Sequence, residues 1–184
     1  MTVFGFHASH EQIAPSQLLR DVIHAEQAGF GAAMSSDHFM PWSQRQGHSG
    51  FTLSWLGAAL ASTSFSIGSV NAPGQRYHPA VVAQATATLA EMFPGRYWTA
   101  LGAGQAMNEH ITGDRWPDQE TRRRRLEESA DVIRRLHRGE TVSHSGWWRW
   151  TPPISTTGRL SPSRSMPPAS PRSPRSVRHA GPRA

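Results

Sequence analysis

The chain has 184 residues, 13 acidic and 19 basic residues, a formal net charge of +6 and no cysteine. Without cysteine, disulfides, thiolate metal sites and cysteine nucleophiles are excluded. The length suffices for one domain with a sizeable core. No run approaches the roughly 18 apolar residues of a membrane span, and residues 1–5 lack the charged opening of a signal peptide. We therefore expect a cytoplasmic protein without a membrane partner.

The positive charge is confined to the carboxyl-terminal segment. Residues 1–150 hold all 13 acidic residues and 13 of the 19 basic ones, which sum to zero, whereas residues 151–184 hold six Arg and no acid. Every basic residue is Arg, which is typical of a GC-rich genome. Because the first 150 residues are neutral, the charge pattern predicts no nucleic-acid partner for them.

Four β-prone segments alternate with four segments of helical periodicity. Ser16 is a suitable N-cap for the first helix, because it follows Pro15 and precedes apolar residues at helical spacing. Arg122 to Arg125 lie among acidic residues in the last helix, so we expect a solvated face linked by ion pairs. The strands are predicted at residues 2–7, 32–36, 65–70 and 96–102, and the helices at 16–29, 53–60, 80–92 and 118–136.

Regular strand–helix alternation predicts an α/β fold built from parallel βα units. A doubly wound sheet and half of a (β/α)8 barrel both contain four such units in a row. Periodicity alone does not distinguish the two.

The composition changes at residue 151. Residues 151–184 contain 8 Pro and 7 Ser with almost no apolar residues, so this segment buries too little to offset its ordering entropy. We therefore predict a domain at 1–150 and a disordered tail at 151–184. An Arg-rich tail is one explanation, and out-of-frame translation beginning near residues 146–151 is another, which the abrupt change favours.

Chemically useful side chains follow the predicted strands. The apolar residues 32–34 lead through two serines into Asp37 and His38, which places a carboxylate and an imidazole at the carboxyl end of a strand, where α/β folds carry their active sites. The alternative is that Asp37 caps a turn and His38 is an ordinary half-buried imidazole. Gly102-x-Gly104 follows the fourth strand and is by itself a weak phosphate-loop signal. The histidines include no i, i+4 pair with an acidic residue between its members, so the sequence predicts no metal site.

Several motifs occur together and in order between residue 2 and about residue 150. They are Ala8-Ser9-His10-Glu11-Gln12, Ser36-Asp37-His38-Phe39-x-Pro41-Trp42, Gly68-Ser69-Val70, Arg76-Tyr77-His78-Pro79-Ala80 and Gly102-x-Gly104-x-Ala106-x-Asn108-Glu109. This set resembles the bacterial-luciferase-like family of flavin- and deazaflavin-dependent oxidoreductases, near its deazaflavin-dependent glucose-6-phosphate dehydrogenase branch.

The resemblance implies a (β/α)8 barrel with FMN or the deazaflavin coenzyme F-420 across its carboxyl face. It implies that Asp37 and Asn108 bind the cofactor and that Ser69-Val70 forms a non-prolyl cis peptide against the ring. It also implies that His38 acts in catalysis and that Trp42 walls the substrate side.

This chain departs from the family pattern in three places. The sugar-phosphate dehydrogenases of the family carry a proposed proton donor, Glu, where this chain has Gln105, and an amide cannot donate that proton. Ala72 replaces the Thr expected after the cis peptide. The pattern also ends before the fifth strand, so the fold expected is the N-terminal half of the barrel. Such a half-barrel exposes two sheet edges, and we expect it to be marginally stable unless it forms a homodimer through them.

Two functions follow from these expectations. The first is an oxidoreductase that transfers hydride between a small-molecule substrate and FMN or coenzyme F-420, with molecular oxygen as a co-substrate if FMN is used. The alternative is a truncated barrel fragment without activity.

Overall fold

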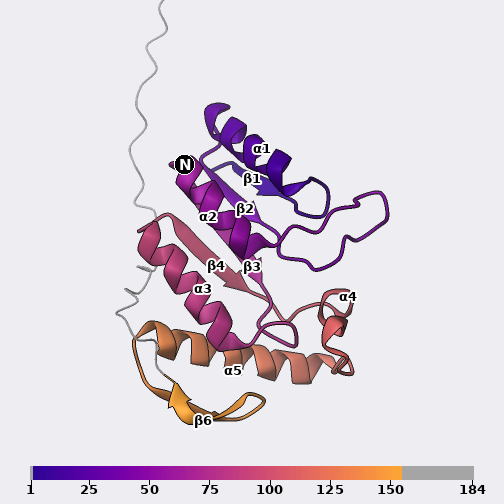
Figure 1. Ribbon diagram of the computed structural model, residues 1–184, viewed down its shortest axis with the longest axis vertical. Coiled ribbons are helices and arrows are strands. Elements are labelled where there is room, and N and C mark those ends of the chain that lie inside the picture. Colours follow the sequence, from indigo (N-terminus) through magenta and orange to yellow (C-terminus); the bar gives the residue numbers. More distant parts are fainter. Residues whose placement is uncertain (1, 155–184) are drawn as a thin grey trace, which may run out of the picture.

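The structure, a computed structural model, describes residues 2–154. Strands and helices alternate along this part of the chain (Figure 1). The main sheet contains β1 (Gly5–Ala8), β2 (Ala32–Ser35), β3 (Ser66–Asn71) and β4 (Tyr97–Leu101). The helices are α1 (Pro15–Gln27), α2 (Thr52–Ser62), α3 (Pro79–Met92), α4 (Ala106–Glu109) and α5 (Gln119–His137), and a 3-10 turn, η1 (His110–Thr112), follows α4.

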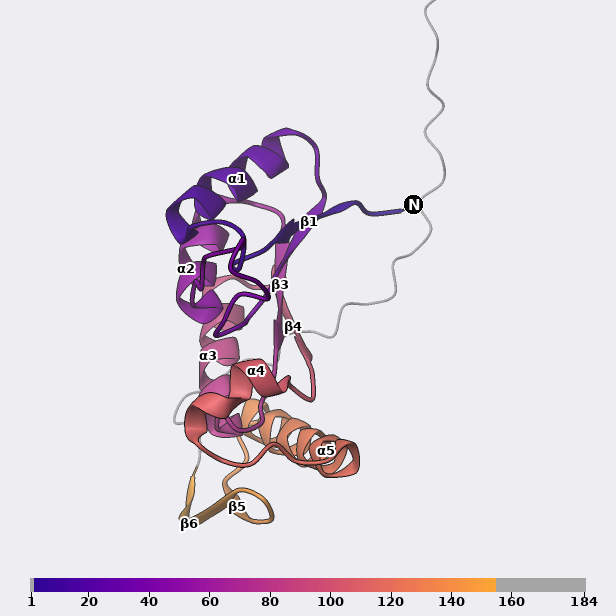
Figure 2. The ribbon, with the colours of Figure 1, turned by 90° about the vertical axis from the view of Figure 1, so that its right-hand side faces the viewer.

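The four strands are parallel and their order in the sheet is β1-β2-β3-β4. A doubly wound sheet reverses its strand order at a switch point and carries helices on both faces. Here the order follows the chain, and α1, α2 and α3 cover one face (Figure 2). The geometry therefore resolves the alternative left by the sequence: these units form half of a (β/α)8 barrel, with the helices on its outer side.

The main core lies between the sheet and these three helices. Leu18 and Val22 of α1, Leu56 and Leu60 of α2, and Ile67 of β3 have no exposed surface. Full burial of an aliphatic side chain of this size contributes about 1.5–3 kcal/mol. The α/β periodicity of the sequence thus arises from burial against one sheet face.

A smaller core lies where α5 crosses α3. It contains Val82 of α3, Val132 and Leu136 of α5, and Val142 from a hairpin of β5 (Val142–Ser145) and β6 (Arg149–Ile154). This antiparallel hairpin was not predicted. Because β6 continues to Ile154, strand structure extends past the boundary predicted at residue 150. The rest of the predicted tail, residues 155–184, lies outside the described residues.

Two local predictions were wrong. Ser16 is not the N-cap of α1, because the helix begins at Pro15 and its cap position, Ala14, makes no side-chain hydrogen bond. Within the basic run of α5, Arg123 and Arg124 form exposed ion pairs as expected, but Arg125 is buried. In the described part of the chain, no helix is long and apolar enough to cross a membrane.

Candidate active site

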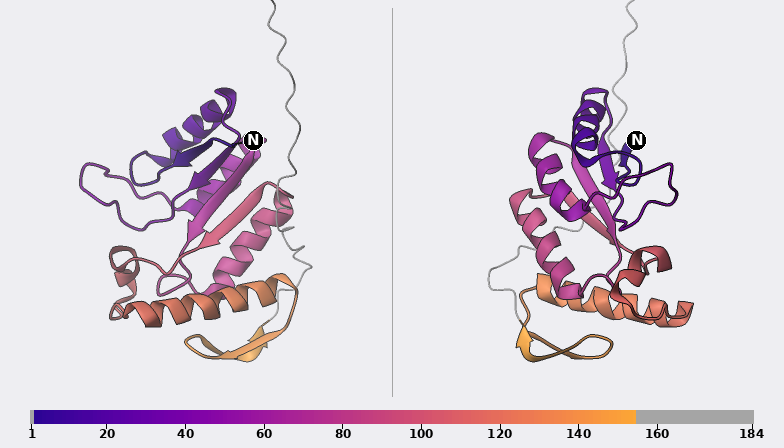
Figure 3. Two further views of the ribbon diagram at one scale, coloured as in Figure 1. Left: turned by 180° about the vertical axis from the view of Figure 1, so that it is seen from behind. Right: turned by 45° about the vertical axis from the view of Figure 1, so that its right-hand side comes forward.

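The carboxyl ends of the four strands lie at the same end of the sheet, because the strands are parallel (Figures 1 and 3). The segments that follow β2, β3 and β4 enclose a cavity of about 190 Å³ there. Its walls are formed by Asp37, His38, Val70, Asn71, Ala72, the loop 102–105, Asn108 and Glu109. Residues separated by up to 72 positions in the sequence thus share one pocket.

Glu11 and His38 form a hydrogen-bonded pair at this cavity. Nδ1 of His38 lies in hydrogen-bond contact with Oε1 of Glu11, while Oε2 of Glu11 accepts hydrogen bonds from Ser9 (2.6 Å) and Ser36 (2.9 Å). Burial opposes ionisation of Glu11, but the hydrogen bonds from His38, Ser9 and Ser36 outweigh it and lower its pKa to about 2. An ionised Glu11 favours the proton on Nδ1 and leaves Nε2 of His38 free to exchange a proton.

Trp42 packs edge to face against His38, with ring centroids 5.3 Å apart. Its side chain is 55% exposed and does not line the cavity. Trp42 therefore lies beside the Glu11–His38 pair, at the outer side of the imidazole.

The carboxylate of Asp37 is occupied by protein partners. Its oxygens accept hydrogen bonds from Nδ2 of Asn71 (2.8 Å) and from the hydroxyl of Tyr77 (3.0 Å), and an ion pair of 3.2 Å joins it to Arg76. Burial raises the pKa of Tyr77, and the nearby Asp37 carboxylate raises it further, so Tyr77 stays a hydrogen-bond donor. Asp37 stands at the cavity but has little free hydrogen-bonding capacity for a ligand.

Arg76 joins two buried carboxylates. Besides its contacts with Asp37, its backbone N–H donates to Oε2 of Glu109 (2.7 Å), and its Nε lies 3.9 Å from Oε1 of the same residue. The side chains of Asp37 and Glu109 are each 1% exposed. Arg76 therefore links the segment after β2 to that after β4 and balances their charge.

Ser69 and Val70 lie on opposite faces of β3. The buried hydroxyl of Ser69 donates to Asn71 (2.6 Å) and contacts the hydroxyl of Tyr97 (2.8 Å), so it points toward the helices. Val70 points to the uncovered face, is 38% exposed and lines the cavity. Of these two predicted cofactor contacts, only the side chain of Val70 faces the cavity.

Asn108 holds the loop after β2 in place. Its side-chain oxygen accepts hydrogen bonds from the backbone N–H groups of Phe39 (2.9 Å) and Met40 (3.0 Å), and its Nδ2 donates to Oε1 of Gln105 (3.2 Å). Asn108 is buried and Gln105 is exposed, and both line the cavity. The amide of Asn108 is thus used to shape the site.

Two other histidines near the first strand are separate from the pair. His7 is exposed on β1, whereas His10 is fully buried and packs edge to face on Trp55 at 5.0 Å. Burial lowers the pKa of His10, with partial opposition from Glu11 and Asp37. Among residues 2–154 no group of three or more acidic or histidine side chains is arranged to hold a metal ion.

Sequence reasoning assigned no role to Glu11, Arg76 or Glu109, although all three occur in the motifs that carry the resemblance. The available signal for Glu11 was its position directly after the first strand, which matches that of Asp37 after the second. Its partner is 27 positions away, and neither local spacing nor periodicity identifies a contact over that distance.

The loop after β4 contributes Gly102, Ala103, Gly104 and Gln105 to the cavity wall. Gly104 has a φ of 80°, and a Cβ atom there would lie 3.2 Å from Cγ of Glu109. A side chain at this position would be both strained and crowded. Glycine at this position therefore lets the loop pack closely against the side chain of Glu109.

Comparison with known proteins agrees with this geometry. A family model described as luciferase-like monooxygenase matches residues 1–181. An F420-dependent glucose-6-phosphate dehydrogenase from Nakamurella multipartita is 45% identical over 145 residues, which are 78% of this chain and 43% of that protein. The chain thus spans about half the length of the curated relatives it matches.

Solved structures show the same half-barrel. An F420-dependent secondary alcohol dehydrogenase in complex with an F420-acetone adduct is 36% identical, with a TM-score of 0.78 over 88% of this chain and 49% of that one. The FMN complex of the oxygenating constituent of 3,6-diketocamphane monooxygenase from Pseudomonas putida has a TM-score of 0.70 over 88% of this chain and 48% of that one, and at 17% identity it shows the fold alone. The expected fold class is confirmed, and the chain belongs to the luciferase-like monooxygenase family.

Proposed function

We propose that this chain provides half of the active site of an oxidoreductase that transfers hydride between a small-molecule substrate and a deazaflavin, coenzyme F-420, with FMN as the alternative cofactor. The observation that carries the proposal is the Glu11–His38 pair, which borders a cavity formed by three strand ends. The relatives named above support the cofactor class.

The residues present fit one edge of a planar ring. Val70 offers an apolar surface on the uncovered side of β3, and Gly102, Ala103 and Gly104 contribute a wall with no side chain larger than a methyl group. The cavity of about 190 Å³ is smaller than the roughly 300–1,000 Å³ of typical small-molecule sites. These residues would therefore hold the ring edge, and the rest of the cofactor needs a further wall.

His38 is the proposed proton-transfer group. Substrate oxidation at a carbinol carbon releases a proton along with the hydride, and a general base must lie within hydrogen-bond reach of it. Gln105 cannot take that role, since an amide does not titrate. Glu11 holds Nδ1 of His38, so Nε2 would receive the proton. Trp42 would exclude water from the outer side of the imidazole.

The two cofactors supply different chemistry when bound: a deazaflavin carries hydride, and reduced FMN also reacts with oxygen. F-420 is the first choice, because the relative at 45% identity uses it. Asp37 and Asn108 would act mainly through the loops that they hold, and Ser69 through its support of Asn71.

The setting that we propose is the cytoplasm, because a chain without cysteine depends on no oxidising compartment. A nucleic-acid partner is not proposed, because the first 150 residues are neutral. The assembly that we propose is a homodimer.

Cofactor titration tests the function. Purified protein titrated with F-420 and separately with FMN should change the fluorescence of at least one of them at saturable ratios. Val70→Arg, which fills the cavity, should weaken binding at least tenfold, whereas Val81→Arg on the exposed side of α3 should leave it unchanged. If neither cofactor binds the folded protein, the alternative of an inactive barrel fragment is correct.

A further inference from the structure

A second cavity lies beside α5, apart from the one at the strand ends. Its volume is about 400 Å³, which falls in the range of roughly 300–1,000 Å³ that is usual for small-molecule sites. Its walls come from the turn after β3, the segment between η1 and α5, α5 itself and the turn of the β5–β6 hairpin, which Figure 1 shows beneath α5. Among the described residues, this cavity and the one at the strand ends have no lining residue in common.

Arg125 of α5 brings a buried cation to this cavity. The residue is 7% exposed and lines the cavity, and its Nη2 is buried without a hydrogen-bond partner among the described residues. Glu109 and Asp114 attract the guanidinium from a distance, but burial has the larger effect and lowers the pKa of Arg125. Arginine stays protonated in proteins, and a buried charge without a partner is unfavourable. An anion in the cavity would supply that partner.

Glu109 does not supply it, because Arg76 already engages this carboxylate. The backbone N–H of Arg76 donates to Oε2 of Glu109 (2.7 Å), and its Nε lies 3.9 Å from Oε1. Gly74 lies beside both charged groups, since a Cβ atom there would be 3.3 Å from Nη2 of Arg125 and 3.7 Å from Oε2 of Glu109. Glycine therefore adds no side chain to the space next to the guanidinium.

Gln75 contributes a second unpaired polar group. Its Nε2 donates to the backbone oxygen of Arg115 (3.3 Å) and so ties the turn after β3 to the segment before α5. Its Oε1 is buried and has no hydrogen-bond partner in residues 2–154. Buried polar groups in proteins are nearly always paired. An unpaired donor on Arg125 and an unpaired acceptor on Gln75, beside one cavity, therefore indicate a polar occupant.

Two indole rings form the apolar part of the wall. Trp148 is held in place, because its backbone N–H donates to Glu128 (3.1 Å) and its indole N–H donates to Ser129 (3.0 Å). Trp147 is 57% exposed and also lines the cavity. Flat indole surfaces favour contact with another aromatic ring, so the occupant indicated by this wall carries a ring as well as a charge.

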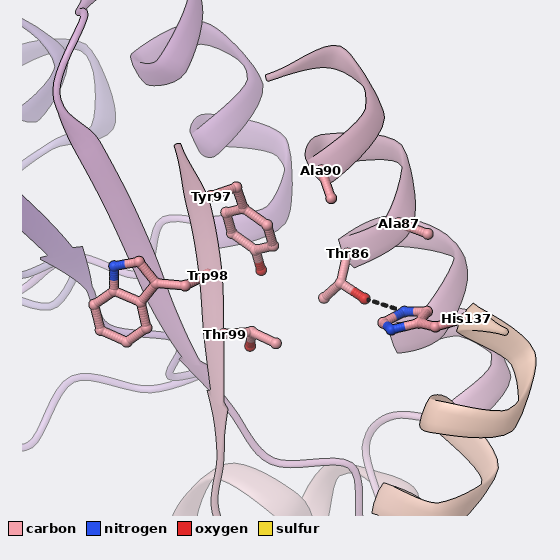
Figure 4. A pocket seen from close by; sticks show the side chains of 7 residues that line it. All are labelled: Thr86, Ala87, Ala90, Tyr97, Trp98, Thr99 and His137. Atoms are coloured by element: carbon pink, nitrogen blue, oxygen red, sulfur yellow. Dashed lines mark hydrogen bonds between the residues drawn. The ribbon is translucent and has the colours of Figure 1, made fainter. Parts of the chain in front are cut away.

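A smaller cavity between β4, α3 and α5 lacks these features. Its volume of about 30 Å³ leaves room for about two water molecules. Figure 4 shows Thr86 hydrogen-bonded to His137, at 3.1 Å, and the hydroxyl groups of Tyr97 and Thr99 are hydrogen-bonded too. These four side chains are satisfied within the protein, unlike the polar groups at the larger cavity.

We propose that the larger cavity is a binding site for a small aromatic carboxylate, whose carboxylate pairs with Arg125 and whose ring packs on Trp148. A guanidinium holds a carboxylate through two parallel hydrogen bonds. The lining residues favour a single negative charge, because Arg125 and Arg115 are cations, Asp114 is an anion, and one positive charge remains. A hydroxyl or amino group on the ring would donate to Oε1 of Gln75.

Titration with benzoate tests the site. Isothermal titration of the full chain with sodium benzoate should show saturable one-to-one binding with a dissociation constant of at most about 1 mM. Benzamide keeps the ring without the charge, and acetate keeps the charge without the ring. Each should bind more weakly than benzoate by about tenfold or more.

Variants locate the bound benzoate. Arg125→Met removes the guanidinium, keeps an unbranched side chain and should abolish saturable binding. Trp147→Glu, at a position that is 57% exposed, places a like charge beside the ligand and should weaken binding by about tenfold or more. Val81→Glu adds the same charge at a 53% exposed position on α3 and should bind benzoate as the wild type does. Circular dichroism checks that each variant is folded.

Three results with folded protein would overturn the proposal. They are no saturable binding of benzoate, equal affinity for benzamide or acetate, and an affinity that Trp147→Glu leaves unchanged. The last of these decides the matter even if Arg125→Met does not fold.

Val70→Trp separates the two cavities, because it fills the one at the strand ends without adding a charge. Benzoate affinity should be unchanged in this variant, and a loss of affinity would place benzoate at the strand ends and contradict the proposal. The site does not rest on the proposed function. A chain that binds benzoate beside α5 but binds neither F-420 nor FMN retains this inference and contradicts the proposed function.

Discussion

The carboxylate of Glu11 holds Nδ1 of His38 although the two residues are 27 positions apart and follow different strands. β1 and β2 are adjacent and parallel, with Ala8 paired to Ser35, so the residues directly after each strand reach the same place. Ser36 strengthens the arrangement, because it lies two residues before His38 and its hydroxyl donates to the same carboxylate of Glu11. An imidazole fixed in this way has one defined tautomer before any substrate arrives.

Glu11→Gln should change how stability depends on pH. The pKa of Glu11 is lowered from 4.5 to about 2, so its carboxylate stabilises the fold above pH 4.5, and this stabilisation is lost as the pH falls through about 2. The difference is on the order of 2–3 kcal/mol. Urea unfolding from pH 6 to pH 2 should show the wild type losing this margin over Glu11→Gln. Glu127→Gln, at a largely exposed carboxylate, is the control and should follow the wild-type curve.

His38→Asn should separate binding from turnover. An amide of similar size can keep a hydrogen bond to Glu11 but cannot take up a proton, so cofactor affinity should stay within a few-fold of wild type. In the proposed reaction, turnover of a small-molecule substrate, followed by the absorbance of the deazaflavin, should fall by about 10²–10⁴-fold. Equal turnover by the variant would show that proton transfer occurs elsewhere.

Arg76→Leu should be strongly destabilising. Removal of this guanidinium leaves Asp37 and Glu109 buried without their shared cation, and breaking a buried pair in this way costs about 3–5 kcal/mol. Chemical denaturation with circular dichroism measures the loss. Arg123→Leu removes two exposed ion pairs on α5, to Glu120 and Glu127, and should cost at most about 1 kcal/mol. Similar losses in both variants would mean that the buried network contributes little.

Asn108→Ala should loosen the loop between β2 and α2. The substitution leaves the N–H groups of Phe39 and Met40 without their acceptor, and each lost partner of a part-buried group costs about 1–3 kcal/mol. Limited proteolysis should cut within residues 39–50 several-fold faster than in the wild type, with little change elsewhere. Thr112→Ala, which loses two hydrogen bonds of an exposed turn near α4 and none to the loop after β2, is a suitable control. An unchanged cleavage pattern would argue against Asn108 as the anchor of the loop.

Gly68→Ala should be destabilising unless Trp98 is also changed. The added methyl group would lie 2.0–2.3 Å from the indole, so the ring must move from the strand, at a cost of about 1–3 kcal/mol. Trp98→Leu should remove most of this cost, and a double-mutant cycle of unfolding free energies measures the coupling. Additive effects would show that the two side chains do not compete for this space.

The sequence by itself determined the units of this protein. Alternation of β-prone and helical segments located all four strands of the sheet within a few residues, and the motifs after them, such as Asp37-His38 and Gly102-x-Gly104, marked the end of the sheet that carries the cavity. These features are local, because burial of one helix face or one strand imposes a period on the residues themselves. The zero net charge of residues 1–150 was also available from the sequence, because it requires only a count of acidic and basic residues.

The tertiary structure decided how those units are arranged and which of their side chains are in contact. Strand order distinguished a half-barrel from a doubly wound sheet, and strand pairing brought Glu11 to His38. The direction of Ser69 toward the helices and the burial of Arg125 depended on neighbours far away in the chain. Each of these contacts joins segments that are far apart in the sequence. Such contacts leave no periodic pattern in the residues on either side, so the sequence alone does not reveal them.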